Sequence, residues 1–184
     1  SPDGTELIYS ISTPRGPNEE AGQAHRKYYQ MDVESKVSDL LFEEKIKGGA
    51  PQYSPDGSYI AFTYKKKDEK TQVWAMPADG GDIIQLTNAK NGVSYYRWQP
   101  EGLGIAYLSK EGKTEKEEEL EKRGYGFIFY EENLKDNRLF ITNFDEYFNE
   151  VKTMEILEGI HVWDFEFSPD GQYLAFSTSE KNLI

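Results

Sequence analysis

The feature that most constrains the fold is a short phrase that recurs four times in 184 residues. It begins at Ser1, Ser54 and Ser168 as Ser-Pro-Asp-Gly, and at Gln99 as Gln-Pro-Glu-Gly. The copies are separated by 53, 45 and 69 residues, and each is followed by an apolar and aromatic run such as "SYIAFTY". One turn-and-strand unit at this spacing indicates a repeat architecture, in which each repeat is one supersecondary unit.

The phrase has the chemistry of a tight turn. Proline fixes φ near −65°, aspartate tolerates the next turn position, and glycine supplies the positive φ that closes the reversal. We therefore predict a hairpin with a three-residue loop and a bulge at the glycine. The predicted structural turn residues are Pro2, Asp3, Gly4, Pro55, Asp56, Gly57, Pro169, Asp170 and Gly171.

The second repeat gives the clearest strand pattern. Short strand-like runs precede the turn, follow it at residues 58–64, and recur at residues 71–77 and 83–87. Tight turns and one polar loop separate them, and no helical period competes. Four short antiparallel strands per repeat predict an all-β fold, a partial β-propeller of about three four-stranded blades. A β-sandwich is the structural alternative, but it would not require the same turn at each interval.

The repeats divide a single domain, residues 1–184, into units of about 1–49, 50–93, 94–160 and 161–184. The strand runs amount to fewer blades than the roughly four to eight of a closed propeller. Unpaired strand edges and open faces would remain at both ends of such an arc. We therefore expect either a larger protein that contains this segment or self-association through the open blade edges.

Composition limits the classes of partner and the compartment. A net charge of −12 argues against nucleic acid and anionic membrane surfaces, because both require basic patches. No apolar run approaches the roughly 20 residues that span a bilayer. The absence of cysteine fits a cytoplasmic protein, although periplasmic and secreted proteins share this trait.

The chain offers no nucleophile-elbow motif. The nearest stretch, residues 92–96, has Tyr96 where Gly-x-Ser-x-Gly requires its last glycine. Of the two histidines, His25 lies in a polar loop and His161 enters a predicted strand, so each is interpreted as structural or solvated. Acidic and histidine residues show no metal-ligand spacing. We expect no catalytic residue, no metal and no cofactor within this chain.

Candidate binding residues lie on the first strand of each repeat, which is the innermost strand of a propeller blade. Tyr95, Tyr96 and Arg97 belong to the third repeat, and Glu166 belongs to the fourth. Aligned on the turn, Arg97 and Glu166 occupy equivalent positions, so we predict a contact between them. The two tyrosines are either ligand contacts at the channel mouth or core residues.

Strand reversal also predicts which loops share a face. The Pro-Asp-Gly turns and the turns between the third and fourth strands of each repeat belong to one face. The long excursions at residues 13–26, 65–70 and 109–137 then share the opposite face. Because loops on a rigid scaffold carry most binding functions, we expect this second face to be the working face. Tolerated loop decoration is the alternative.

The third repeat carries a family resemblance. Its long insertion, "SKEGKTEKEEELEKRGYGFIFYEENLKDNRLFITNFD", precedes "HVWDFEFSPDGQYLAFS". The phrase Ser-Pro-Asp-Gly with a following "IAF"-like strand resembles TolB-type propellers and the propellers of prolyl-oligopeptidase-family serine peptidases. The charged insertion and the aromatic segment after it resemble the acylaminoacyl- and dipeptidyl-peptidase members of that family. Residues 113–123 of the insertion also read as a solvated helix with Glu/Lys pairs.

This resemblance implies a non-catalytic propeller that gates or positions peptide substrates for a separate α/β-hydrolase domain. The implied partners are that hydrolase domain, in the same full-length protein, and a peptide substrate. The catalytic serine, aspartate and histidine of the family would belong to the other domain. A TolB-like propeller that acts as a protein-binding module is the alternative.

Overall fold

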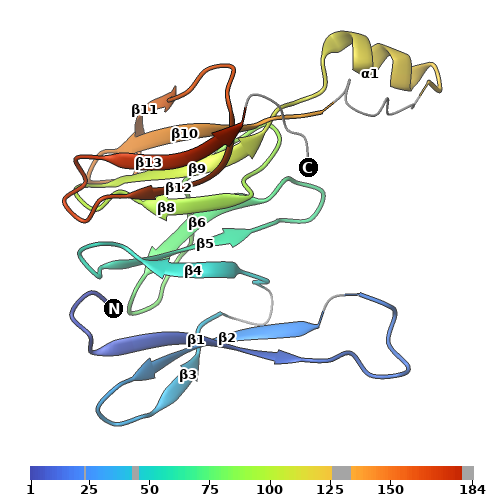
Figure 1. Ribbon diagram of the computed structural model, residues 1–184. Helices are drawn as coiled ribbons and strands as arrows, with labels where there is room; N and C mark the ends of the chain where they lie inside the picture. Colours follow the sequence, from blue (N-terminus) through green and yellow to red (C-terminus); the bar gives the residue numbers. More distant parts are fainter. Residues whose placement is uncertain (23, 43–45, 126–133, 180–184) are drawn as a thin grey trace.

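The computed structural model describes residues 1–184 except 23, 43–45, 126–133 and 180–184. Four antiparallel sheets follow one another along the chain and stack face to face (Figure 1). This architecture confirms the predicted all-β partial propeller. The four sheets contain the following strands: β1 (Glu6–Thr13), β2 (His25–Asp32) and β3 (Ser38–Leu40); β4 (Gly49–Tyr53), β5 (Tyr59–Tyr64), β6 (Gln72–Pro77) and β7 (Ile84–Gln85); β8 (Tyr95–Trp98), β9 (Gly104–Lys110), β10 (Asn137–Phe144) and β11 (Glu150–Glu155); β12 (His161–Phe167) and β13 (Leu174–Ser179).

The repeated turn is built the same way in the first, second and fourth sheets. In the second, the Ser54 N–H donates to the Tyr59 carbonyl at 2.8 Å, and the Tyr59 N–H donates to Ser54 Oγ at 2.9 Å. Gly57 has φ +77°, which is why glycine is required there. The predicted three-residue loop is wrong by one residue. Four residues lie between the paired Ser54 and Tyr59, because the serine side chain replaces a backbone acceptor.

The aspartate of each Ser-Pro-Asp-Gly turn is held as a carboxylate. Asp56 Oδ1 accepts from Ser54 Oγ at 2.6 Å and from the Ser58 N–H at 3.1 Å. The serine hydroxyl is the main cause of a lowered pKa at Asp56 and Asp170, and it holds the pKa of Asp3 at about 2. Hydrogen bonds to the charged form favour that form, so the folded turn binds protons less readily than the unfolded chain.

These turns predict an acid-sensitive fold. A carboxylate whose pKa is lower in the folded state stabilises the fold above its ordinary pKa of 3.8, and that contribution disappears as the pH falls through the folded value. We expect the free energy of unfolding to decrease between about pH 4 and about pH 2. Urea denaturation across this range should show a shallower decrease in Asp56→Asn. An equally steep decrease in Asp56→Asn would contradict this assignment.

Three apolar clusters fill the spaces between consecutive sheets. Leu41 and Phe42, which directly follow β3 of the first sheet, pack against Ile60 and Phe62 of the second, with the Phe42 and Phe62 rings 4.7 Å apart. A cluster between the second and third sheets and another between the third and fourth repeat this pattern. The core is therefore divided into layers between sheets.

Small residues let each sheet approach the next. Ala61 is fully buried and faces the third sheet, whereas its neighbours Ile60 and Phe62 face the first. Ala106, also fully buried, faces Phe165 of the fourth sheet. Ala175, the equivalent in the fourth sheet, is exposed. The small residue is therefore buried against the next sheet in the second and third sheets, each of which has a following sheet.

One helix occurs among the described residues: α1 (Glu115–Lys122) projects from the third sheet and buries none of its residues (Figure 1). This confirms the predicted solvated helix. Thr114 and Glu117 form a reciprocal capping box. Lys135 Nζ contacts Glu117 Oε2 at 2.5 Å, which ties the helix start to the residues that lead into β10. No helix within the described residues is long and apolar enough to span a membrane. Most of the predicted aromatic segment after the helix lies outside the described residues.

Candidate functional site

The candidate residues lie on the strands that begin the second, third and fourth sheets. β4, β8 and β12 each form one edge of their sheet and each precede a repeated turn. Their equivalent positions hold Gln52, Arg97 and Glu166. Gln52 Nε2 donates to the Tyr96 carbonyl at 3.2 Å, and Arg97 Nε lies 3.3 Å from Glu166 Oε2. A row of polar side chains thus connects three consecutive sheets, and the predicted Arg97–Glu166 contact is confirmed.

Tyr95 completes the part of this row that ligands can reach. Its ring meets Phe165 edge to face at 5.3 Å, and the Arg97 guanidinium carbon lies 4.5 Å from the ring centroid. The Arg97 side chain is about one-third exposed and Glu166 about two-thirds exposed. Tyr95, Arg97 and Glu166 therefore offer one cation, one carboxylate and part of an aromatic ring at the inner edge of the arc.

Of the two roles predicted for the tyrosines, ligand contact or core residue, Tyr96 has the second. Only 1% of its surface is exposed, and burial raises the pKa of its hydroxyl. That hydroxyl lies 2.6 Å from the Ala50 carbonyl oxygen and 2.8 Å from the Ala61 carbonyl oxygen, and it shares its one hydrogen between them. Tyr96 therefore anchors the third sheet to the second and offers no accessible atom to a ligand.

The Arg97–Glu166 ion pair should contribute little to stability. Both side chains face solvent, where water and salt screen the attraction. We expect Arg97→Met to lower the free energy of unfolding by less than about 1 kcal/mol. A double-mutant cycle with Glu166→Gln, read by urea denaturation, measures the coupling. A coupling well above that value would contradict a solvent-exposed row and would indicate a desolvated pair.

The loop arrangement agrees with the predicted two faces. The connections β1–β2 and β5–β6 and the insertion that carries α1 all lie at one end of the stacked sheets, opposite the repeated turns (Figure 1). A cleft of about 600 Å³ lies beside the β7–β8 connection. Asn88 and Asn91 of this connection line the cleft together with Tyr107, Arg138 and Glu155. This cleft and the long excursions belong to the same end of the sheets.

Arg138 is a charged residue that the sequence pattern did not single out. Its side chain is mostly buried, forms an ion pair with Glu111, and lies 3.8 Å from Glu155 and 4.0 Å from Asp136. Burial lowers its pKa, but the hydrogen bond and charge of Glu111 outweigh that effect, so the pKa is raised overall. Arg138 therefore joins the end of β9 to β10 and β11.

Neither histidine has the geometry of a triad base within the described residues. His25 begins β2 rather than lying in the predicted loop, and its exposed ring lies 3.0 Å from Glu19. His161 is buried, and its Nδ1 accepts from the Asn137 N–H at 3.2 Å and lies 3.2 Å from Asp136. In the same described portion, no group of three or more His, Asp or Glu side chains is placed to hold a metal ion.

Comparison with curated proteins finds a distant relative that matches part of the chain. No family model matches the chain. Over 133 residues the chain is 26% identical to YuxL of Bacillus subtilis, an uncharacterized peptidase; the match covers 65% of this chain and 20% of that protein. The chain thus spans only a fifth of this relative.

Solved structures share the fold. TolB from Acinetobacter baumannii matches 95% of this chain with a TM-score of 0.60 at 16% identity, over 35% of its own length. An acylaminoacyl peptidase from Pyrococcus horikoshii matches 86% with a TM-score of 0.58 at 14% identity, over 25% of its length. The β-propeller domain of the Trilobed protease from Pyrococcus furiosus matches 87% with a TM-score of 0.54 at 12% identity, over 42% of its length. The chain has the β-propeller fold of TolB and of these peptidase propeller domains.

Proposed function

We propose that this chain is the non-catalytic propeller part of a serine peptidase, which positions or gates peptide substrates for a separate α/β-hydrolase domain of the same polypeptide. The observation that carries the proposal is the sequence match with the peptidase YuxL, which extends over 133 residues yet covers only 20% of that protein. The fold likeness to the acylaminoacyl peptidase is consistent with it.

We propose that the binding surface is the end of the sheets that bears the long loops. These loops, α1 and the cleft of about 600 Å³ are presented by rigid antiparallel sheets, which is the usual way that binding loops are held. The partly exposed Arg97 and the exposed Glu166 at the inner edge of the arc suit the carboxylate and amine groups of a short peptide. We propose that they contact substrate on its way to the catalytic domain.

The test is hydrolysis of peptide p-nitroanilides by the full-length protein. Turnover is expected from the full-length protein, with a KM about threefold higher and an unchanged kcat in Arg97→Ala, because a positioning contact acts on binding. Lys152→Ala, on the exposed strand β11, is the matched control and should leave both constants unchanged. Full activity of residues 1–184 alone would overturn the non-catalytic role, and unaltered kinetics in Arg97→Ala would overturn the contact.

A protein-binding module is the second candidate. Its support is the fold match with TolB, which covers 95% of this chain. A full-length protein that lacks peptidase activity and consists of further propeller repeats would favour this function. In that case the same excursion-bearing face is the surface expected to hold the partner protein.

A further inference from the structure

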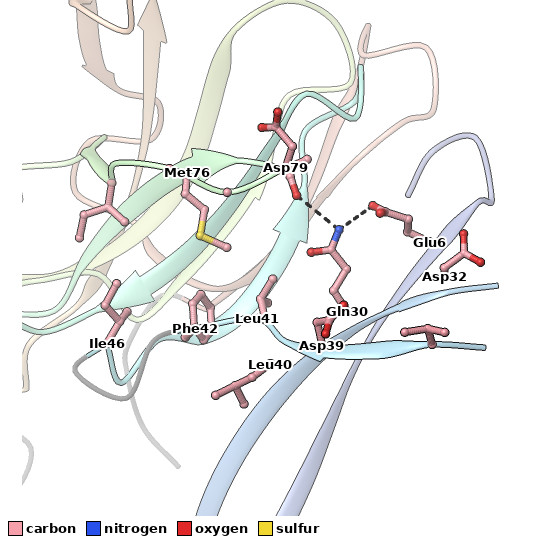
Figure 2. A pocket seen from close by; sticks show the side chains of 15 residues that line it. Glu6, Gln30, Asp32, Asp39, Leu40, Leu41, Phe42, Ile46, Met76 and Asp79 are labelled. Carbon is pink, nitrogen blue, oxygen red and sulfur yellow. Dashed lines mark hydrogen bonds between the residues drawn. The ribbon is translucent and has the colours of Figure 1, made fainter. Parts of the chain in front are cut away.

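A second cleft lies on the other side of the stack, between the first and second sheets, and has a volume of about 460 Å³ (Figure 2). Its walls include Asp32 and Val37 at the β2–β3 turn, and residues 78–81 at the β6–β7 turn. It therefore lies toward the repeated turns, away from the excursion-bearing face. The volume falls within the range of roughly 300–1,000 Å³ that is usual for sites of small ligands.

The floor of this cleft is apolar. Leu41, Phe42 and Met76 are buried beneath it, and Ile83 closes one side. Leu40, on the edge strand β3, is 44% exposed and also lines the cleft. Figure 2 shows Ile46, Met76 and Phe42 on one side of the cleft and the acidic side chains on the other. An apolar floor of this kind favours an occupant with an aliphatic portion.

The rim is acidic. The charged side chains among the described lining residues are four carboxylates and no cation: Glu6, Asp32, Asp39 and Asp79. Asp39 and Asp79 are exposed, and neither side-chain carboxylate forms a hydrogen bond or ion pair among the described residues. The nearby turns of these two sheets add Asp3, Glu34 and Asp56 against one lysine, Lys36. The electrostatic field at this rim therefore attracts a cation.

Two further details keep the cleft open and polar at its acidic end. Gln30 Nε2 donates to Glu6 Oε2 at 2.7 Å and to the Ala78 carbonyl at 3.3 Å, which joins the two sheets across the cleft (Figure 2). Gly80 and Gly81 have φ of +93° and +142°, and their lack of side chains leaves the β6–β7 turn backbone accessible. A peptide backbone can thus approach this wall closely.

We infer that this cleft binds a lysine or arginine side chain presented by a peptide. The aliphatic stem of such a side chain lies on the apolar floor, and its cationic head meets Asp39 and Asp79 at the rim. An apolar residue satisfies only the floor, and a small metal cation satisfies only the rim. The inference does not depend on the proposed peptidase function, since a binding module would use the same chemistry.

The probe is fluorescein-labelled Gly-Lys-Gly amide, titrated into the full-length protein and followed by fluorescence anisotropy. A matched peptide with norleucine in place of lysine keeps the stem and removes the charge, and it should bind at least about fivefold more weakly. Equal affinity for the two peptides would overturn the charge assignment. Unlabelled pentylamine, added as a competitor of the labelled lysine peptide, provides the free-amine arm. Displacement as strong as that by unlabelled lysine peptide would overturn the assignment to a peptide.

Variants locate the site. Asp79→Asn should weaken binding of the lysine peptide about fivefold, whereas Asp82→Asn, three residues along the same turn and outside the cleft, should change it less than about twofold. Leu40→Trp, at an exposed position, should fill the cleft and abolish binding while the melting temperature is retained. No binding up to about 10 mM peptide, or equal effects of the two aspartate variants, would overturn the inference.

Discussion

Replacing Phe62 with alanine is expected to lower the free energy of unfolding by about 3–5 kcal/mol. Phe62 is fully buried, and its ring lies 4.7 Å from that of Phe42 across the space between the first two sheets. Truncation removes this contact and leaves a cavity that two stacked sheets cannot easily collapse. Urea denaturation of the purified protein, followed by circular dichroism, measures the effect.

The control for Phe62 is Tyr147, an aromatic residue of the β10–β11 turn that is 73% exposed. Tyr147→Ala should change the free energy of unfolding by no more than about 0.5 kcal/mol. If Phe62→Ala were as mild as Tyr147→Ala, the first two sheets would not pack through this layer. The face-to-face arrangement of consecutive blades would then be wrong at its first junction.

Removal of the Tyr96 hydroxyl should give the second large effect. Tyr96→Phe keeps the ring in its buried position but leaves the carbonyl oxygens of Ala50 and Ala61 without the hydrogen that they share. Buried polar groups that lose a partner cost about 1–3 kcal/mol, so a decrease of that size is expected. Tyr173→Phe, at a largely exposed tyrosine in the repeated turn, should leave stability within about 0.5 kcal/mol of the parent.

The Tyr96 result separates two interpretations of the inner strands. A stability loss with no effect on peptide kinetics supports Tyr96 as an anchor between sheets. A full-length Tyr96→Phe protein with unchanged stability and a raised KM would instead support direct ligand contact. The second outcome would contradict the buried hydroxyl geometry.

Local chemistry made much of the fold predictable from the sequence. Ser-Pro-Asp-Gly specifies a turn because each residue has a defined role, and the alternation around Ala61 and Ala106 specifies which faces meet. The loop length was wrong by one residue because the Ser54 side chain takes a backbone acceptor's place. Whether the serine hydroxyl accepts this hydrogen bond in place of a backbone carbonyl depends on the serine rotamer, which a residue pattern does not encode.

The candidate site was predictable only in part. Alignment of the repeats placed Arg97 opposite Glu166, since equivalent positions on adjacent blades are neighbours. The same alignment could not separate Tyr95 from the buried Tyr96, because successive residues of a strand point to opposite faces and the burial of each face depends on its neighbours. The acidic cleft was missed for another reason. Its described walls come from Glu6, from residues between 30 and 42, from Ile46, and from residues between 76 and 83, which share no motif and meet only when two sheets stack.

The central functional claim is that catalysis belongs to a domain outside this chain. Its most direct test is to label the full-length protein with a fluorophosphonate probe, which modifies activated serines, and to map the modified peptide by mass spectrometry. We expect one labelled serine outside residues 1–184, and no labelling of residues 1–184 expressed alone. Labelling of a serine within residues 1–184, or no labelling of the full-length protein, would contradict this claim.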